Sequence, residues 1–250
     1  MRLLFYFFKA LHIIVVIGVV LLKFASILFL ISLLLLLPFT SVDNETLTVS
    51  SALVNQGKNK IIIDAGHGGF DGGAVAEDGT LEKDINLLIA SNLKEFCKLG
   101  GFEVIMTRES DTGTEVDESD SISNRKKSDM KRRLAVIEEN PDAIFVSIHL
   151  NKFTTSTASG AQVFYSKNHT NSEFLAECVQ KTMVDLIQKE NTRTIKQADN
   201  SIFLLKKSNI PSIIIECGFL SNFSELKLLK NYDYQRKIAF AIYCGILNYY

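Results

Sequence analysis

Several features are scarce or absent in this sequence of 250 residues. Only four cysteines are present, and nothing in their spacing requires a disulfide framework. Internal repeats are missing, so the sequence gives no sign of a separate repeat-based binding module. The short zinc-binding motif HExxH is missing as well. Any metal or catalytic site must therefore be assembled by the fold from residues that lie far apart in the chain.

Acidic residues are absent from the stretch Leu3–Phe39. About 20 apolar residues cross a bilayer, and Ile13–Leu37 offers 25 with Lys23 as its one charge. A lysine in the middle of a span costs about 3 kcal/mol, whereas each Leu, Ile, Val or Phe returns about 0.3 to 0.6 kcal/mol. The apolar residues outweigh the lysine, so we expect residues 1–39 to form one membrane-spanning anchor.

The charges that flank this segment predict its orientation. Arg2 and Lys9 precede the span, whereas Asp43 and Glu45 follow it, and the positive-inside rule then places the N-terminus in the cytoplasm. The rest of the chain is expected outside the membrane, with a polar linker at 40–59 and one domain at 60–250. A cleaved signal peptide and a two-span hairpin remain alternatives, but no clean cleavage site and no turn residues favour them.

The domain after the anchor carries a mildly acidic charge. Removing three basic residues of the anchor from the 27 in the chain leaves 24 Lys and Arg against 28 Asp and Glu. Nucleic acid is therefore not an expected partner, because binding to it requires clustered positive charge.

Strand and helix patterns alternate along the domain. Strands are expected at Lys60–Ile63, Phe102–Met106, Ala143–His149, Gly160–Tyr165, Ile202–Leu205 and Ser212–Ile215. Helices are expected from an N-cap at Thr80 to Gly100 and at Asn124–Asn140, Ser172–Lys189, Ser224–Lys230 and Asp233–Leu247. This order predicts an α/β fold with a twisted, mostly parallel sheet of about six strands flanked by helices. The basic runs Arg125–Lys127 and Lys131–Arg133 are expected on a solvated helix face.

Three side chains with metal-binding chemistry are expected at one edge of this sheet. His67 follows the first strand, His149 ends another, and Glu82 lies in the first turn of a helix. The ends of parallel strands and the starts of the following helices share an edge, so the three can converge. Two imidazoles and a carboxylate form a standard catalytic zinc set. Taken singly, His67 could be a surface residue and Glu82 a carboxylate favoured by the helix dipole.

Glu216 follows the apolar strand Ser212–Ile215 directly. An unpaired buried carboxylate is costly, so Glu216 needs a polar partner. A role as catalytic base beside a metal-activated water would supply one, and a salt bridge to a helix is the alternative. Cys217 is conceivable as a further ligand, but side chains alternate along a strand, which directs Cys217 away from Glu216.

Four motifs together resemble a known family. The segments DAGHGG, LEKD, SIHLN and PSIIIECGFLSN are similar, in order and spacing, to the zinc-dependent N-acetylmuramoyl-L-alanine amidases of the amidase-3 family. The resemblance covers residues 60–250. It implies zinc ligands at His67, Glu82 and His149 and a catalytic glutamate at Glu216. It also implies hydrolysis of the amide between muramic acid and L-alanine in peptidoglycan.

The resemblance extends to membrane-anchored members that act in spore cortex formation, and an activating partner protein is conceivable. Further candidates for binding the peptidoglycan substrate are Asn151, Arg193 and Lys196. Two other functions stay open at this point. One is a different extracytoplasmic zinc peptidase, and the other is a catalytically silent protein that binds the cell wall.

Overall fold

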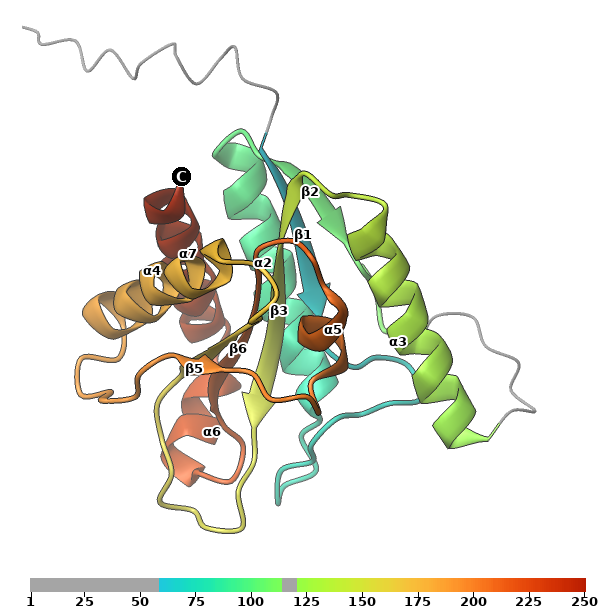
Figure 1. The fold of residues 1–250 in the computed structure, drawn as a ribbon. Helices are drawn as coiled ribbons and strands as arrows, with labels where there is room; N and C mark the ends of the chain where they lie inside the picture. The colour runs from blue at the N-terminus through green and yellow to red at the C-terminus, as the bar shows by residue number, and fades with distance from the viewer. Residues whose placement is uncertain (1–58, 114–120) are drawn as a thin grey trace, which may run out of the picture. The chain divides into compact units, whose positions relative to one another are not determined.

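Six strands form one sheet in the computed structural model, which describes residues 59–113 and 121–250 (Figure 1). The strands are β1 (Lys60–Ala65), β2 (Glu103–Met106), β3 (Ala143–Asn151), β4 (Gln162–Tyr165), β5 (Lys196–Gln197) and β6 (Ser212–Phe219). Their order across the sheet is β2-β1-β3-β6-β4-β5. All neighbours pair in parallel except β4 and β6, which are antiparallel. The predicted mostly parallel α/β sheet is confirmed.

Helices cover both faces of this sheet (Figure 1). They are α2 (Glu82–Leu99), α3 (Ile122–Glu138), α4 (Asn171–Leu186), α5 (Phe203–Lys207), α6 (Phe223–Leu229) and α7 (Tyr232–Tyr249). Figure 1 shows α3 and α5 on one side of the sheet and α4 and α7 on the other. We call the side with α3 and α5 the site face and the other side the back face.

The alternation of side chains along each strand divides the core between the two faces. On β1, Ile61, Ile63 and Ala65 belong to a large apolar cluster with α2, α4 and α7. Ile62 belongs to a smaller cluster with apolar residues of α3 and α5 on the site face. Asp64, one place further along this face, is only 1% exposed. Polar residues therefore replace apolar ones on the site face as the strands approach their carboxyl ends.

Two predicted elements are wrong in detail. The run Ile202–Leu205 was expected as a strand, but Phe203–Lys207 forms the short helix α5. An apolar run of only four residues does not distinguish strand from helix by its period, and α5 buries Leu204 and Leu205 against the site face.

The predicted N-cap of α2 is also wrong. Leu81, not Thr80, is the N-cap residue, and it makes no side-chain cap hydrogen bond. The N–H of Glu82 donates instead to the carbonyl of Ala74, and that of Lys83 donates to the carbonyl of Gly72. Backbone carbonyls of the preceding loop thus satisfy donors that a capping side chain would otherwise bind.

The predicted anchor at 1–39 and nearly all of the linker at 40–59 lie outside the described residues. Within 59–113 and 121–250, no helix is both long and apolar enough to cross a membrane.

Candidate metal centre

His67, Glu82 and His149 meet at the carboxyl edge of the sheet. His67 lies two residues beyond β1, His149 lies near the end of β3, and Glu82 is the first residue of α2. One potential ligand atom from each side chain lies within 4.8 Å of those of the other two. The two imidazole rings meet edge to face, with centroids 4.9 Å apart. Residues separated by 15 and 67 positions are therefore neighbours because of the parallel topology.

Glu82 lies between the two imidazoles. Its Oε2 is 3.2 Å from Nε2 of His67, and its Oε1 is 3.0 Å from Nδ1 of His149. Burial disfavours the charged carboxylate, but hydrogen bonds to His149 and His67 outweigh burial and lower the pKa of Glu82. Glu82 also accepts hydrogen bonds from the N–H groups of Ala74 (2.8 Å) and Leu150 (3.0 Å). The carboxylate is held firmly in its ionised form.

Two glycines leave the space that this cluster requires. A Cβ added to Gly66 would lie 2.3 Å from Nε2 of His149, so any side chain there would displace the ring. A Cβ added to Gly73 would lie 2.6 Å from Oε2 of Glu82. Gly73 also has a φ of +69°, which side chains seldom adopt. The glycines of this loop are therefore needed for close packing around the two imidazoles.

The backbone of His67 is held in an unfavourable conformation. Its φ is +61°, a left-handed value that costs a residue with a side chain about 1 to 2 kcal/mol. Two buried arginines bind the carbonyl groups here. Arg133 donates from Nη2 to the oxygen of His67 (2.6 Å), and Arg108 donates from Nε to Ala65 and from Nη2 to Gly66. Strained conformations persist where surrounding contacts fix them, and they are frequent in active sites.

The imidazole of His67 has a second partner on its other side. Its Nδ1 lies 2.8 Å from Oδ2 of Asp71. Burial lowers the pKa of His67, but hydrogen bonds to Asp71 and Glu82 outweigh burial and raise the pKa to about 9. Because metals bind the neutral imidazole, zinc and protons compete for His67.

Glu216 lies beside this cluster on the neighbouring strand. It pairs in register with His149, and parallel pairs place their side chains on the same face. Its Oε2 is buried and has no hydrogen-bond partner among the described residues. Burial raises the pKa of Glu216 and outweighs the neighbouring His149, which lowers it, while the negative charge of Glu82 also raises it. Glu216 makes none of the described salt bridges, so the alternative of a helix salt bridge gains no support.

Cys217 faces away from this site, as predicted. It is fully buried and belongs to the back-face cluster. All four cysteines of the chain are free.

The three predicted substrate-binding residues differ in where they lie relative to the cluster. Arg193 donates to the side chain of Gln162 (3.3 Å), and Gln162 is the register partner of Glu216 on β4. Asn151 is half-buried at the end of β3, two residues beyond His149. Lys196 is exposed on the edge strand β5. Arg193 is thus linked through Gln162 to the strand position opposite Glu216, and the roles of all three residues stay predictions.

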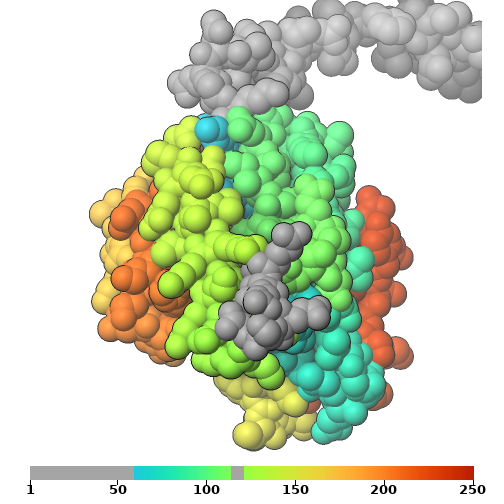
Figure 2. Space-filling view, turned by 90° about the vertical axis from the view of Figure 1, so that its right-hand side faces the viewer, coloured from blue at the N-terminus to red at the C-terminus, as the bar shows by residue number. Residues whose placement is uncertain are grey.

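A cavity of about 370 Å³ opens next to His67 and His149 on the site face. Apolar side chains form part of its wall, among them Phe70, Met130 and Phe203. Lys126, Asp129 and Arg133 of α3 also line it. Figure 2 shows α3, in yellow-green, beside the blue-green segment that follows β1. The cavity therefore borders two of the three residues of the cluster.

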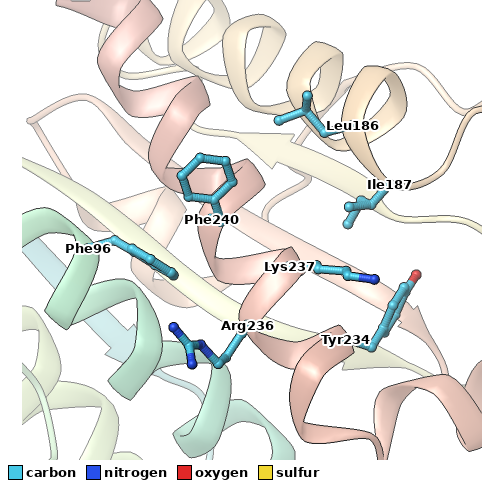
Figure 3. Close-up of a pocket in the computed structure, with 7 residues that line it drawn as sticks. All are labelled: Phe96, Leu186, Ile187, Tyr234, Arg236, Lys237 and Phe240. Carbon is cyan, nitrogen blue, oxygen red and sulfur yellow. The ribbon is translucent and has the colours of Figure 1, made fainter.

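A second cavity, of about 540 Å³, lies on the back face (Figure 3). It is lined by residues of α2, of α7 and of the end of α4: Phe96, Leu186, Ile187, Tyr234, Arg236, Lys237 and Phe240. These residues include no imidazole, thiol or carboxylate, so the lining of this cavity lacks the usual side chains of a zinc site.

The sequence interpretation missed the role of helix α3. Its basic residues were expected on a solvated face, but Arg133 is only 3% exposed and forms a buried ion pair with Asp64. Lys126 binds Asp71 at 2.9 Å. Spacing along the helix held a usable signal, since residues 126, 129, 130 and 133 fall on one side. The acidic partners of Lys126 and Arg133, Asp71 and Asp64, lie far away in the sequence, so the helix spacing alone does not identify them.

The donor set of the cluster fits zinc. Zinc binds histidine nitrogen at about 2.0 to 2.1 Å and carboxylate oxygen at about 2.0 to 2.2 Å, usually with four ligands. Two atoms bound to one ion at such distances lie at most about 4.4 Å apart. The ligand atoms here lie within 4.8 Å of one another, so small side-chain adjustments bring all three within reach of one ion. Three protein ligands leave one position for water or substrate, as catalytic zinc sites require.

Comparisons with known proteins find relatives of this chain. A Bacillus subtilis (strain 168) protein named germination-specific N-acetylmuramoyl-L-alanine amidase is 39% identical over 76% of this chain and 79% of its own length. The structure of the CwlD amidase from Clostridioides difficile in complex with the GerS lipoprotein matches with 45% identity and a TM-score of 0.74. That match covers 77% of this chain and 98% of the other. The amidase AmiC2 of Nostoc punctiforme matches with 31% identity and a TM-score of 0.66, over 78% and 98% of the two chains.

The sequence model of one family, described as N-acetylmuramoyl-L-alanine amidase (Amidase_3), matches residues 61–248. This match covers all but one residue of the sheet, all but one residue of its helices, and the His67–Glu82–His149 cluster. The chain therefore belongs to the N-acetylmuramoyl-L-alanine amidase family.

Proposed function

We propose that this chain is a zinc-dependent peptidoglycan amidase. It hydrolyses the amide bond between the lactyl group of N-acetylmuramic acid and the L-alanine of the stem peptide. The observation that carries the proposal is the convergence of His67, Glu82 and His149 beside Glu216 in a chain of the amidase family.

The residues divide the chemistry between them. His67, Glu82 and His149 would hold zinc, which when bound would polarise the amide carbonyl and lower the pKa of a coordinated water. Glu216 accepts a proton from the attacking water as the water oxygen bonds to the carbonyl carbon. Glu216 then gives that proton to the alanine nitrogen as the carbon–nitrogen bond breaks. A carboxylate whose pKa is raised by burial suits both steps.

Substrate binding is proposed for the groups around this centre. The cavity beside His67 and His149 receives part of the muropeptide. Arg193, whose guanidinium lies 4.6 Å from the centre of the Phe219 ring, is proposed to bind a carboxylate of the stem peptide. Lys196 and Asn151 are proposed as weaker contacts at the rim.

The relatives support a proposal for the biological setting. The germination-specific relative and the CwlD amidase support a role in spore cortex maturation. We propose that residues 1–39 anchor the chain to a membrane with the catalytic domain on the extracytoplasmic side. Because the CwlD amidase was solved in complex with a lipoprotein, we propose that this chain also binds a partner protein, and that this partner activates it. Full activity of the purified chain alone would count against the need for such a partner.

Mass spectrometry of digested peptidoglycan tests the reaction. The purified chain with zinc is expected to release stem peptides with a free L-alanine amine and to leave intact glycan strands. A chelator should stop the reaction, and added zinc should restore it. Cleavage inside the stem peptide would instead indicate a different zinc peptidase. Binding without any cleavage would indicate a silent wall-binding protein.

A further inference from the structure

Asp71 contacts the one ring nitrogen of His67 that faces away from the candidate metal cluster. The Nε2 of His67 lies 3.2 Å from Glu82, inside the cluster, whereas Nδ1 lies 2.8 Å from Oδ2 of Asp71. Asp71 itself is not one of the three clustered residues. The two nitrogens of His67 thus face two different carboxylates, one within the cluster and one outside it.

The carboxylate of Asp71 is fixed by its other oxygen. Its Oδ1 lies 2.9 Å from Nζ of Lys126 on α3, and it accepts a longer hydrogen bond from the N–H of Gly73 (3.4 Å). The backbone of Asp71 exchanges two hydrogen bonds with that of Gly68, at 2.9 and 3.0 Å. Asp71 is therefore fixed by its backbone and by both of its carboxylate oxygens.

We propose that Asp71 and Lys126 are positioning residues that set the zinc affinity of His67. A carboxylate that accepts the Nδ1–H of an imidazole selects the tautomer whose Nε2 lone pair is free for a metal. It also orients the ring and makes it a stronger ligand. The proposal rests on the zinc site of the proposed function and adds two residues to it.

Lys126 acts through Asp71 and not on the metal. It neutralises the oxygen of Asp71 that His67 does not contact, and it ties Asp71 to α3. The same helix supplies Arg133, which donates to the backbone carbonyl of His67 at 2.6 Å. Helix α3 thus fixes His67 twice, at its ring through Lys126 and Asp71 and at its backbone through Arg133.

Zinc affinity, measured on the full-length chain by competition with a chromophoric chelator, tests the proposal. Asp71→Asn keeps the shape of the side chain but removes its charge, and should weaken zinc binding about 10- to 100-fold. Lys126→Met should weaken binding less, about two- to fivefold, as expected for a partly exposed ion pair. Lys126→Arg should restore affinity because it can still pair with Asp71.

Lys127→Met is the matched control. It removes the same charge from the next residue of α3, which is exposed, and should leave zinc affinity unchanged. The melting temperature of the metal-free protein is measured for each variant. A positioning role predicts weaker zinc binding with little change in this temperature. A merely structural role would lower the temperature and the affinity together.

Three results would overturn the proposal. The first is an Asp71→Asn protein that binds zinc within twofold of the unmodified chain. The second is an equal effect of Lys126→Met and Lys127→Met. The third is a loss of affinity that parallels a loss of metal-free stability. If the unmodified chain itself binds no zinc, the proposed function fails together with this proposal. Each of the three results above, by contrast, overturns only the role of Asp71 and Lys126.

Discussion

The imidazole of His149 packs directly against the α-carbon of Gly66, leaving no room for a methyl group between them. A Cβ at position 66 would lie 2.3 to 2.7 Å from three atoms of that ring. The loop after β1 and the end of β3 are thus in direct contact at Gly66 and His149. This contact fixes how closely His149 can approach the loop that carries His67.

Gly66→Ala is expected to remove tight zinc binding while the domain still folds. The added methyl group must displace the ring of His149, and displacing one of three ligands moves it out of bonding distance of the ion. Gly72→Ala is the control, because its added Cβ would meet only Leu81, at 3.4 Å. Zinc content after dialysis and circular dichroism of both variants provide the measurement. A Gly66→Ala protein with full zinc content would show that the ring adjusts without loss.

Asp64 is expected to make stability depend on pH in the acid range. Burial raises the pKa of Asp64, but the Arg133 ion pair and hydrogen bonds from Ser147 and Thr107 outweigh burial and lower it from 3.8 to about 2. A lowered pKa contributes stability that is present above the unfolded value and is lost as the pH falls through the folded value. The shift corresponds to roughly 2 kcal/mol at neutral pH.

Urea unfolding of Asp64→Asn and the unmodified chain between pH 7 and pH 2 checks this expectation. The variant should be less stable by about 2 kcal/mol or more at pH 7. The difference should shrink as the pH falls toward 2, where the native carboxyl group is protonated too. A difference that stays constant across this range would mean that ionised Asp64 does not stabilise the fold.

Much of the candidate site could be predicted because the parallel topology links distant residues by a simple rule. His67 follows a strand, His149 lies near the end of another and Glu82 begins a helix, and such positions share one edge of a parallel sheet. Glu216 was predictable for a different reason, since a carboxylate directly after three isoleucines requires a functional or structural partner. In both cases the local pattern contains the needed information.

The support of the site could not be predicted in the same way. Arg133 looks like any other base in a charged helix, and only the fold shows that it meets Asp64, 69 residues earlier in the chain. Asp71 lies four residues after His67 in a glycine-rich loop, where no helical or strand period determines which side chains meet. Contacts of this kind depend on how loops and helices dock onto the sheet, and the sequence pattern does not encode that docking locally.

His149→Ala and His67→Ala are each expected to abolish tight zinc binding. Two remaining ligands seldom hold zinc in a catalytic geometry. Metal analysis after gel filtration measures the effect, and His169→Ala is the control because His169 is part of the loop before α4 and outside the cluster. Either cluster variant retaining one zinc per chain with unchanged affinity would show that the assigned ligand set is wrong.

The proposed topology predicts a defined pattern of proteolysis. A protease added outside protoplasts of cells that produce this chain should digest residues 40–250 and spare the N-terminal segment. A cytoplasmic protein serves as the control for intact membranes. Complete protection of the domain would contradict the extracytoplasmic placement and would favour the hairpin alternative.

Glu216→Gln and Glu82→Gln are expected to differ in kind, which separates a general base from a ligand. Glutamine at position 216 retains the shape of the side chain but cannot accept a proton. Zinc should stay bound, while turnover falls about 10²- to 10⁴-fold, as is typical when a general base is lost, with KM changed less. Glutamine at position 82 removes the charge that lies between two imidazoles, so zinc and activity should be lost together.

Zinc content and turnover must be measured for both variants on the same muropeptide substrate. The Oε2 of Glu216 is buried and has no hydrogen-bond partner in the part of the chain that the structure describes, so the stability of the metal-free protein provides an independent test. Because a buried charge without a partner is costly, Glu216→Gln should leave the metal-free protein as stable as the unmodified chain or more stable. If Glu216→Gln purifies without metal, Glu216 acts as a ligand. If it hydrolyses substrate at nearly the unmodified rate with zinc in place, Glu216 is not the base, and another group must accept the proton.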